Sequence, residues 1–276
     1  MPVHGTKSFL KQLIPPLLLT LLRKGKKYGW KGDFSDWQQA RDQSGKYEDR
    51  HILEKVKEAI WKVKKGEAAY ERDSVLFNQI QYSWPLLSAL LWVASQNKGG
   101  LKVVDFGGSL GSSYYQNRQF LSGLSHLQWN IVEQENFVRC GQENFQDNEL
   151  NFFYSLDQLV EQQGLPDILL LSCVLPYLEK PYEILKNLME YKIPYILIDN
   201  TYFNYEPRDR ICIQTVPPEI YNASYPCWML NLMAVKMELT QNYQLISEHE
   251  NDSCIFLDGK KIRYRGLLLK KSHENY

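Results

Sequence analysis

The sequence predicts a doubly wound α/β fold with a seven-stranded, mostly parallel sheet and an N-terminal helical cap. From Leu101 onward, short apolar runs alternate with helix-length segments, which is the pattern of parallel strands joined by crossover helices. Glycines follow the first of these runs directly, as they do where a strand turns sharply into a helix. The 276 residues are enough for one such domain and an appendage.

A strand is expected at each short apolar run. The seven runs are residues 102–106, 128–132, 150–153, 167–172, 195–199, 244–249 and 264–270. Asp258-Gly259 lies between the last two runs and is typical of a tight hairpin turn. Between the earlier runs, Ser155-x-x-Gln158 is a capping-box pattern, and Pro181 suits the first position of a helix. Seven strands with a late, irregular pair indicate a Rossmann-like sheet.

The chain divides into three parts. Residues 1–27 are apolar and basic, residues 28–97 form the helical cap, and residues 98–276 form the Rossmann-like domain. The segment from about 201 to 228 is longer than a usual strand–helix connection, and we expect it to be a long loop that acts as a substrate lid.

Two helices are expected in the cap. Apolar residues recur at helical spacing over residues 52–63, and Gly66 marks the end of that helix. A second helix is expected from near Asp73 to residue 91, with Pro85 as an interruption.

The N-terminal segment combines an apolar run at residues 13–22 with basic residues on both sides. A run of about 10 residues is far shorter than the roughly 20 that a membrane-spanning helix needs. Two interpretations remain: the segment packs on the protein or a partner, or residues 7–27 contact an anionic membrane surface. We therefore expect a cytoplasmic protein that could be peripheral at the inner face of the membrane.

The amino-acid composition argues against several classes of function. Lys and Arg together number 32, as do Asp and Glu, and this balance argues against a general nucleic-acid binder. The five cysteines are scattered and form no Cys-x-x-Cys pair, which argues against a zinc site or a disulfide framework and fits a reducing cytoplasm.

The central motif runs from Val103 to Gly111 and contains a strand that ends in Asp105, followed by Gly107, Gly108 and Gly111. Such glycines let a ligand approach the main chain closely. A dinucleotide site has the pattern G-x-G-x-x-G and places a pyrophosphate at the helix N-terminus, where the charge of Asp105 would oppose it. The carboxylate suits an ammonium group instead, such as that of the methionine part of S-adenosylmethionine.

Four further residues complete the expected cofactor site. Glu133 ends the next strand, 22 positions after Gly111, where an acidic residue accepts hydrogen bonds from both ribose hydroxyls. Asp157 follows the third strand and suits either the adenine amino group or the first turn of a helix. Ser172 ends the fourth strand and borders the cofactor. Arg72 suits the methionine carboxylate, with a solvated surface position as the alternative.

The chain resembles a bacterial family of methyltransferases, some encoded near polysaccharide-assembly genes. The resemblance covers most of the length and is carried by the Trp30–Trp37 motif (W-x-G-x-F-x-x-W), Gly66–Ser74, Asp105–Tyr114, Val132–Gln134, Gln214–Pro218 and Ala223–Trp228. It implies the class I methyltransferase fold and S-adenosylmethionine as cofactor, with S-adenosylhomocysteine as product. It leaves the substrate open.

The acceptor side is expected beyond the fifth strand. Asp199 ends that strand and is our candidate for the base that an oxygen acceptor requires, with helix capping or an ion pair as the alternative. Tyr202, Arg210, Tyr225 and Trp228 are the candidate substrate-binding residues. Arg210 equally suits an ion-pair bridge to Glu71 or Asp73 in the cap.

Three functions are compatible with these patterns. The leading hypothesis is O- or N-methylation of a small molecule, or of a glycan or glycolipid, without a metal ion. The first alternative is a methyltransferase-like scaffold without catalysis in envelope polysaccharide assembly. The second is a nicotinamide-dependent enzyme. His51 and His249 are expected to be structural, because nothing near them in the sequence indicates a triad or a metal site.

Overall fold

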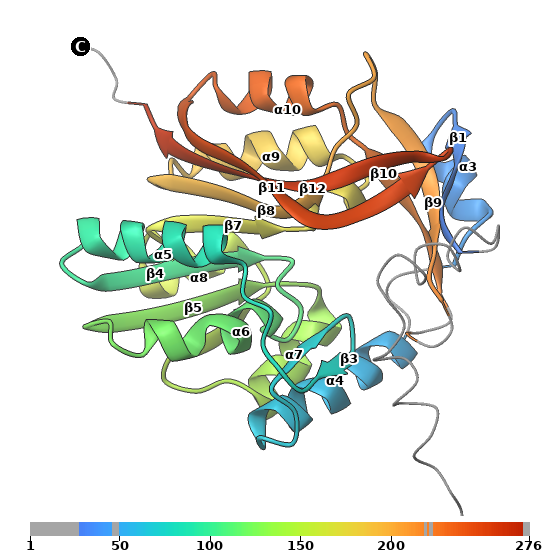
Figure 1. Ribbon diagram of the computed structural model, residues 1–276. Helices are drawn as coiled ribbons and strands as arrows, with labels where there is room; N and C mark the ends of the chain where they lie inside the picture. The colour runs from blue at the N-terminus through green and yellow to red at the C-terminus, as the bar shows by residue number, and fades with distance from the viewer. Residues whose placement is uncertain (1–27, 46–49, 218–219, 221–222, 273–276) are drawn as a thin grey trace, which may run out of the picture.

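A computed structural model describes residues 28–45, 50–217, 220 and 223–272. Its central sheet has seven strands in the order β11-β12-β8-β7-β4-β5-β6, and β12 runs antiparallel to the others (Figure 1). The strands are β4 Gly100–Phe106, β5 His126–Val132, β6 Leu150–Phe153, β7 Ile168–Ser172, β8 Tyr195–Tyr202, β11 Tyr243–Leu257 and β12 Lys260–Lys271. The predicted Rossmann-like α/β fold is confirmed, and each of the seven expected runs overlaps one of these strands, with only residue 167 outside.

Helices cover both faces of this sheet, which makes it doubly wound. One face carries α4 Arg50–Lys64, α5 Trp84–Gln96, α6 Ser112–Leu121 and α7 Glu135–Asn144. The other face carries α8 Leu156–Gln163, α9 Pro181–Glu190 and α10 Leu232–Leu239, with the short 3-10 helix η1 Leu175–Tyr177 after β7. The local signals are confirmed, since Ser155 accepts a hydrogen bond from the Gln158 amide and Pro181 begins α9.

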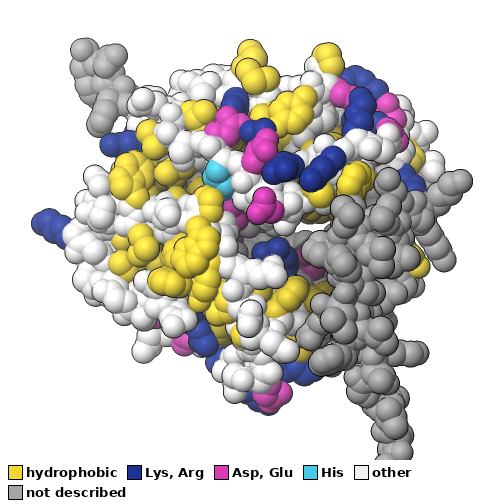
Figure 2. All heavy atoms as spheres, in the orientation of Figure 1, with side chains coloured by type: hydrophobic (Ala, Val, Ile, Leu, Met, Phe, Trp, Pro, Cys, Tyr) yellow, Lys and Arg dark blue, Asp and Glu magenta, His cyan; other side chains and the backbone are white. Residues whose placement is uncertain are grey.

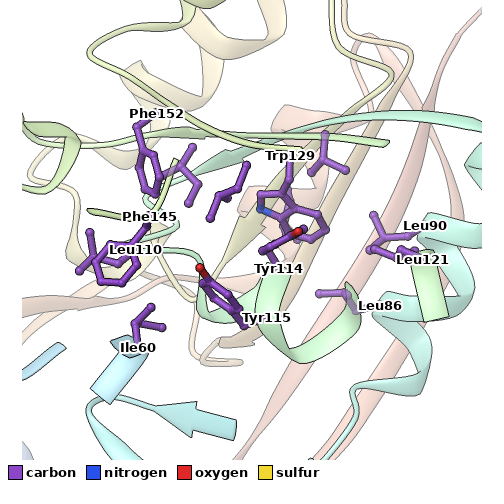
Figure 3. Close-up of a cluster of buried hydrophobic side chains, with 14 of the residues drawn as sticks. Ile60, Leu86, Leu90, Leu110, Tyr114, Tyr115, Leu121, Trp129, Phe145 and Phe152 are labelled. Carbon is purple, nitrogen blue, oxygen red and sulfur yellow. The ribbon is translucent and has the colours of Figure 1, made fainter. Parts of the chain in front are cut away.

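The core on the α4–α7 face is rich in aromatic side chains. Trp129 of β5 is fully buried beside Tyr114 of α6, and Phe145 and Phe152 close the same cluster near α4 (Figure 3). Trp129 also approaches the carboxyl end of β4, so this core reaches the edge of the sheet where ligands bind in α/β folds.

The cap contains strands that the sequence pattern did not predict. Residues from Asp73 do not form a helix: β2 Tyr70–Arg72 and β3 Val75–Phe77 make a hairpin, with Asp73 and Ser74 at positive φ in the turn. Three-residue strands are too short to show a period, and their apolar residues read equally well as a helix start. Pro85 does not interrupt a helix but lies in the first turn of α5, where proline fits.

The 201–228 segment is not a long loop. It contains the end of β8 and two strands, β9 Arg210–Thr215 and β10 Ser224–Met229. These pair with β1 Gly29–Phe34 in a three-stranded antiparallel sheet, and the short helix α3 Trp37–Asp42 packs on it. Because β1 and β9 come from opposite ends of the chain, no local window of sequence reveals their pairing.

Both interpretations of the N-terminal segment, packing on the protein or a partner and contact of residues 7–27 with a membrane, concern residues outside the described ones. Among the described residues, every helix is too short or too polar to cross a lipid bilayer.

Gly141 provides a test of the packing between α7 and β6. A Cβ atom at this position would lie 2.3 Å from the ring of Phe152, which is itself buried. We expect Gly141→Val to lower the free energy of unfolding by about 1–3 kcal/mol, because the ring has no space to move into. Urea denaturation measures the change, with Gly123→Val as control because a Cβ at Gly123 meets no atom within 4 Å. Equal effects of the two substitutions would contradict this packing.

Candidate functional site

A buried carboxylate lies at the carboxyl end of the central strand β4. Asp105 is 1% exposed, and its Oδ2 accepts a hydrogen bond of 3.0 Å from Trp129 Nε1. Burial raises the pKa of Asp105 to about 7, and the nearby charges of Glu133 and Asp199 act in the same direction. Three carboxylates from the ends of β4, β5 and β8 therefore face a common region.

In the loop after β4, Gly107 and Gly108 occupy positions where any side chain would clash with neighbouring atoms. A Cβ on Gly108 would lie 2.5 Å from the carboxyl carbon of Asp105, so this carboxylate fills the space that only a glycine leaves. Gly107 has φ +74°, and a Cβ there would lie 2.4 Å from Val174. Gly111 is the N-cap of α6. The glycines thus let Asp105 and Val174 pack directly against the main chain of the loop, and its role in cofactor binding stays a prediction.

Glu133 lies where the sequence placed it, directly after β5. Its carboxylate accepts a hydrogen bond of 2.6 Å from the Gln134 amide. Burial raises its pKa, and the backbone amides of Gln134 and Ser109 partly offset that effect. The contact with Ser109 shows that Glu133 lies against the glycine loop, so the two parts of the predicted cofactor site are brought together.

Strained backbone marks the same edge of the sheet. Ser109 and Cys173 follow β4 and β7, Asn200 lies in the second half of β8, and all three are non-glycine residues with φ between +46° and +55°. Left-handed conformations of such residues cost roughly 1–2 kcal/mol. Strain of this kind gathers at ligand-binding sites, which supports the carboxyl edge as the functional one.

The β2–β3 hairpin closes over the glycine loop. Glu71 is buried, and its carboxylate accepts hydrogen bonds from the Ser112 hydroxyl in the first turn of α6 and from the Ser74 amide. Burial raises the pKa of Glu71 to about 7. This contact fixes the hairpin at the helix N-terminus.

Arg72 and Asp73 extend from this hairpin toward the carboxylates. Burial lowers the pKa of Arg72, but Tyr70, Asp73 and Asp199 outweigh that effect and raise it. Asp73 is exposed to solvent, yet the surrounding protein raises its pKa by desolvation. Figure 2 shows a hollow in this face of the molecule, between the half that carries β8, β11 and β12 and the half that carries β4 and β5.

Asp199 is buried at the far side of this hollow. Its Oδ1 accepts a hydrogen bond of 3.2 Å from Ser83, the N-cap of α5, and lies 3.7 Å from Nε2 of His249 on β11. Ser172 of β7 lies opposite Asp199 in the parallel register, so these two predicted residues are neighbours.

Two of the predicted substrate residues are engaged elsewhere. Arg210 does not bridge to Glu71 or Asp73; it pairs with Asp258 at 2.6 Å and donates to the Gly32 carbonyl. Trp228 stacks on Trp37 of α3, with ring centroids 5.9 Å apart. Both side chains hold the three-stranded sheet in place.

Tyr202 and Tyr225 are buried in an aromatic cluster between the two sheets. Both contact Tyr177 edge-on, with ring centroids 6.5 Å and 5.4 Å away. Asp157 lies in the first turn of α8 and accepts a hydrogen bond from Tyr191 after α9. The substrate roles of the two tyrosines and the adenine role of Asp157 stay predictions.

Sequence reasoning missed an exposed aromatic cluster beside the hollow. Tyr82, Trp84 and Phe120 have ring centroids 5.0–5.6 Å apart, and Trp84 is 57% exposed. Tyr82 and Trp84 flank Ser83, the residue that donates to Asp199. The sequence offered one usable signal, because two aromatic residues, Tyr82 and Trp84, lie just before Pro85 where a helix begins.

No family model matches the chain, and a search of curated proteins gives no match. Similar solved structures include the N-terminal domain of EvdMO1 in the presence of S-adenosylhomocysteine and D-fucose (12% identity, 82% of this chain and 100% of that one, TM-score 0.47). A magnesium protoporphyrin IX methyltransferase from Synechocystis PCC 6803 with bound S-adenosylmethionine shares 14% identity over 79% and 97% of the chains, with a TM-score of 0.44. A structure from Listeria monocytogenes, described as an S-adenosylmethionine-dependent methyltransferase, shares 10% identity over 69% and 98%, with a TM-score of 0.45. We base the function of this chain on its own residues.

The raised pKa of Glu71 predicts a pH dependence of stability. The folded protein binds this proton with a pKa of about 7 against 4.5 for an ordinary glutamate, so stability is lost as pH rises through that window. A glutamine at position 71 stays neutral at every pH, so Glu71→Gln does not lose this stability. The difference in free energy of unfolding, variant minus wild type, should therefore increase by about 2–3 kcal/mol between pH 5 and pH 8. Urea denaturation at both pH values measures this. Glu67→Gln, at an exposed position, should show no such change; the same difference at both pH values for Glu71→Gln would refute the prediction.

Proposed function

We propose that this protein is an S-adenosylmethionine-dependent methyltransferase. The observation that carries the proposal is the set formed by Asp105, the bare loop at Gly107-Gly108, and Glu133 in contact with that loop. The set lies where β4 has β5 on one side and β7 on the other, which is the point where the strand order reverses. Ligands of open α/β sheets bind at such a point.

The charges favour this cofactor over a dinucleotide. The charges of Glu133 and Asp199 raise the pKa of Asp105, and that of Asp73 raises the pKa of Arg72, so these carboxylates lie close to one another and to Arg72. A pyrophosphate would be repelled by this group of carboxylates. S-adenosylmethionine has an ammonium and a sulfonium group that suit the carboxylates and one carboxylate that suits Arg72.

The residues present fit the parts of this molecule. Glu133 would accept hydrogen bonds from the ribose hydroxyls, while the loop at Gly107-Gly108 and Asp105 would hold the methionine part. Ser172 and Asp157 are our candidates for the neighbouring contacts at the ends of β7 and β6. The bound cofactor supplies a methyl group activated by its sulfonium, so the protein has to align the acceptor and exclude water.

We place the acceptor between Asp199 and the aromatic cluster of Tyr82, Trp84 and Phe120. Exposed aromatic rings beside a polar site suit ligands with an apolar face and a polar edge, as sugars have. This supports O- or N-methylation of a small molecule, a glycan or a glycolipid, and a place in envelope polysaccharide assembly is compatible with it. A scaffold that binds the cofactor without turnover is the competing outcome.

Calorimetry with S-adenosylmethionine, S-adenosylhomocysteine and NADH tests which of these cofactors the protein binds. We expect micromolar binding of the first two and none of NADH. Asp105→Asn and Glu133→Gln should each weaken binding by about 10- to 100-fold, because each removes a charged hydrogen-bond partner. Glu135→Gln is the matched control, since Glu135 is an exposed carboxylate two positions from Glu133. Absence of binding by folded wild type, or tighter binding of NADH, would overturn the proposal.

Trp84 tests the acceptor side. Methyl transfer from labelled S-adenosylmethionine is screened against methyl glycosides and free amino sugars. We expect Trp84→Ala to raise the KM of any accepted sugar by about 10-fold through loss of ring contact, with cofactor affinity unchanged. Met237→Ala is the control, because Met237 is equally exposed but lies on α10, on the opposite face of the sheet. An unchanged KM in Trp84→Ala would remove the aromatic cluster from the acceptor site.

A further inference from the structure

His249 reaches across a whole strand to Asp199. It lies on β11, whereas Asp199 lies on β8, and β12 separates these two strands. The distance between His249 Nε2 and Asp199 Oδ1 is nevertheless 3.7 Å. A contact between side chains of next-but-one strands requires the strand between them to leave room.

Gly266 of β12 leaves that room. It is the register partner of His249. A Cβ atom at Gly266 would lie 2.1 Å from Cε1 and 2.3 Å from Nε2 of the imidazole, closer than any real contact. The ring therefore lies directly over Gly266, and a side chain at this position would displace it from Asp199.

A β-bulge turns Asp199 toward the ring. The β12–β8 register pairs Arg265 with Thr201 and Leu267 with Ile198, so Asp199 and Asn200 together face the single residue Gly266. Asn200 has φ +46°. Bulges of this kind are frequent next to active sites, where they redirect a side chain.

The two side chains differ in their access to the hollow. The Asp199 side chain is 4% exposed, and its Oδ1 already accepts the Ser83 hydroxyl. The His249 side chain is 18% exposed, although its Nε2 is buried and has no hydrogen-bond partner among the described residues. The exposure of the His249 side chain therefore comes from atoms other than Nε2.

The other charged groups around His249 do not compete for the ring. Its neighbours on β11, Glu248 and Glu250, bind Arg265, and Glu248 also pairs with Lys236 of α10 on the opposite face of the sheet. On the hairpin side, the charge of Asp199 contributes to the raised pKa of Arg72. Tyr264 of β12, Asp105 of β4 and Cys173 after β7 are further titratable groups near Asp199.

We propose that His249, rather than Asp199, receives the proton of the methyl acceptor. In the neutral ring, Nε2–H points at Asp199 and Nδ1 carries the free electron pair. Asp199 then positions the ring and stabilises the imidazolium that forms, and apo distances of this kind tighten when substrates bind. This inference rests on the proposed methyltransferase function.

The step balances as follows. A lone pair of the acceptor oxygen or nitrogen forms a bond to the methyl carbon, and the bond from that carbon to the sulfonium sulfur breaks, with its electrons passing to sulfur. The acceptor's proton moves to Nδ1 of His249 and later to solvent. Sulfur ends as a neutral thioether, and no oxidant or reductant is needed.

The tautomer of His249 tests this directly. Long-range proton–nitrogen spectra of protein labelled at the histidine ring nitrogens are recorded with and without S-adenosylhomocysteine, and His249→Gln identifies the signal. We expect the neutral ring to carry its proton on Nε2. Asp199→Asn and Gly266→Ala should each shift the population toward Nδ1–H, because they replace or misplace the acceptor. Gly123→Ala, in open space, should leave the signal unchanged. An Nδ1–H ring in wild type, or one insensitive to both changes, overturns the proposal.

Turnover supplies the second readout. With any sugar accepted in the screen, His249→Gln should slow methyl transfer by about 100- to 10,000-fold. Cofactor affinity should stay within about twofold, and free imidazole should restore part of the rate to His249→Ala. Unchanged turnover in His249→Gln overturns the role of His249. Failure of wild type to bind S-adenosylhomocysteine overturns the methyltransferase proposal instead, so calorimetry separates the two failures.

Discussion

The hydrogen bond between Trp129 and Asp105 is the contact on which the rest of the site depends. Trp129 belongs to the hydrophobic core, and Asp105 ends the strand at the middle of the sheet. Burying a carboxylate with few partners costs free energy, and the structure offsets part of this cost with one indole donor. The remaining cost is visible in the raised pKa of Asp105. Gly108 supplies the space without which this carboxylate could not occupy its position.

Asp105 is one of several buried carboxylates in this region whose pKa values are raised. Glu71 and Asp105 both have a pKa of about 7, and that of Glu133 is also raised, with burial as the leading cause in each. A cation placed beside such groups favours their ionised forms, so its binding is coupled to proton release. A ligand that brings its own positive charge therefore relieves the cost of burying these carboxylates. This is the physical reason why the site suits a sulfonium and an ammonium group.

The sequence predicted the parts of this arrangement that are local. Asp105, its glycines and Glu133 lie at the ends of successive strands, and the rule that parallel strands end at one edge brings them together. The parts that it missed are non-local. No short stretch of sequence predicts the contact of the β2–β3 hairpin with α6 through Glu71 and Ser112. The pairing of β1 with β9 is likewise invisible in any short stretch. Arg210 shows the same limit, because its partner Asp258 lies in a distant turn.

The role proposed for His249 could not be predicted from the sequence, because it depends on how distant strands pair. In the sequence it is an isolated histidine in a polar strand, and a structural role is the simplest interpretation. Its position depends on Gly266, on the bulge at Asp199-Asn200 and on the order β11-β12-β8, and each of these is a property of strand pairing. The proposed acceptor side lies at the late, irregular strands β11 and β12, whereas the proposed cofactor loop lies in the regular parallel half of the sheet. A change of register in β11 or β12 would move His249 while leaving the contacts of Asp105 and Glu133 intact. Under the proposed assignment, the acceptor chemistry could therefore vary independently of the cofactor site.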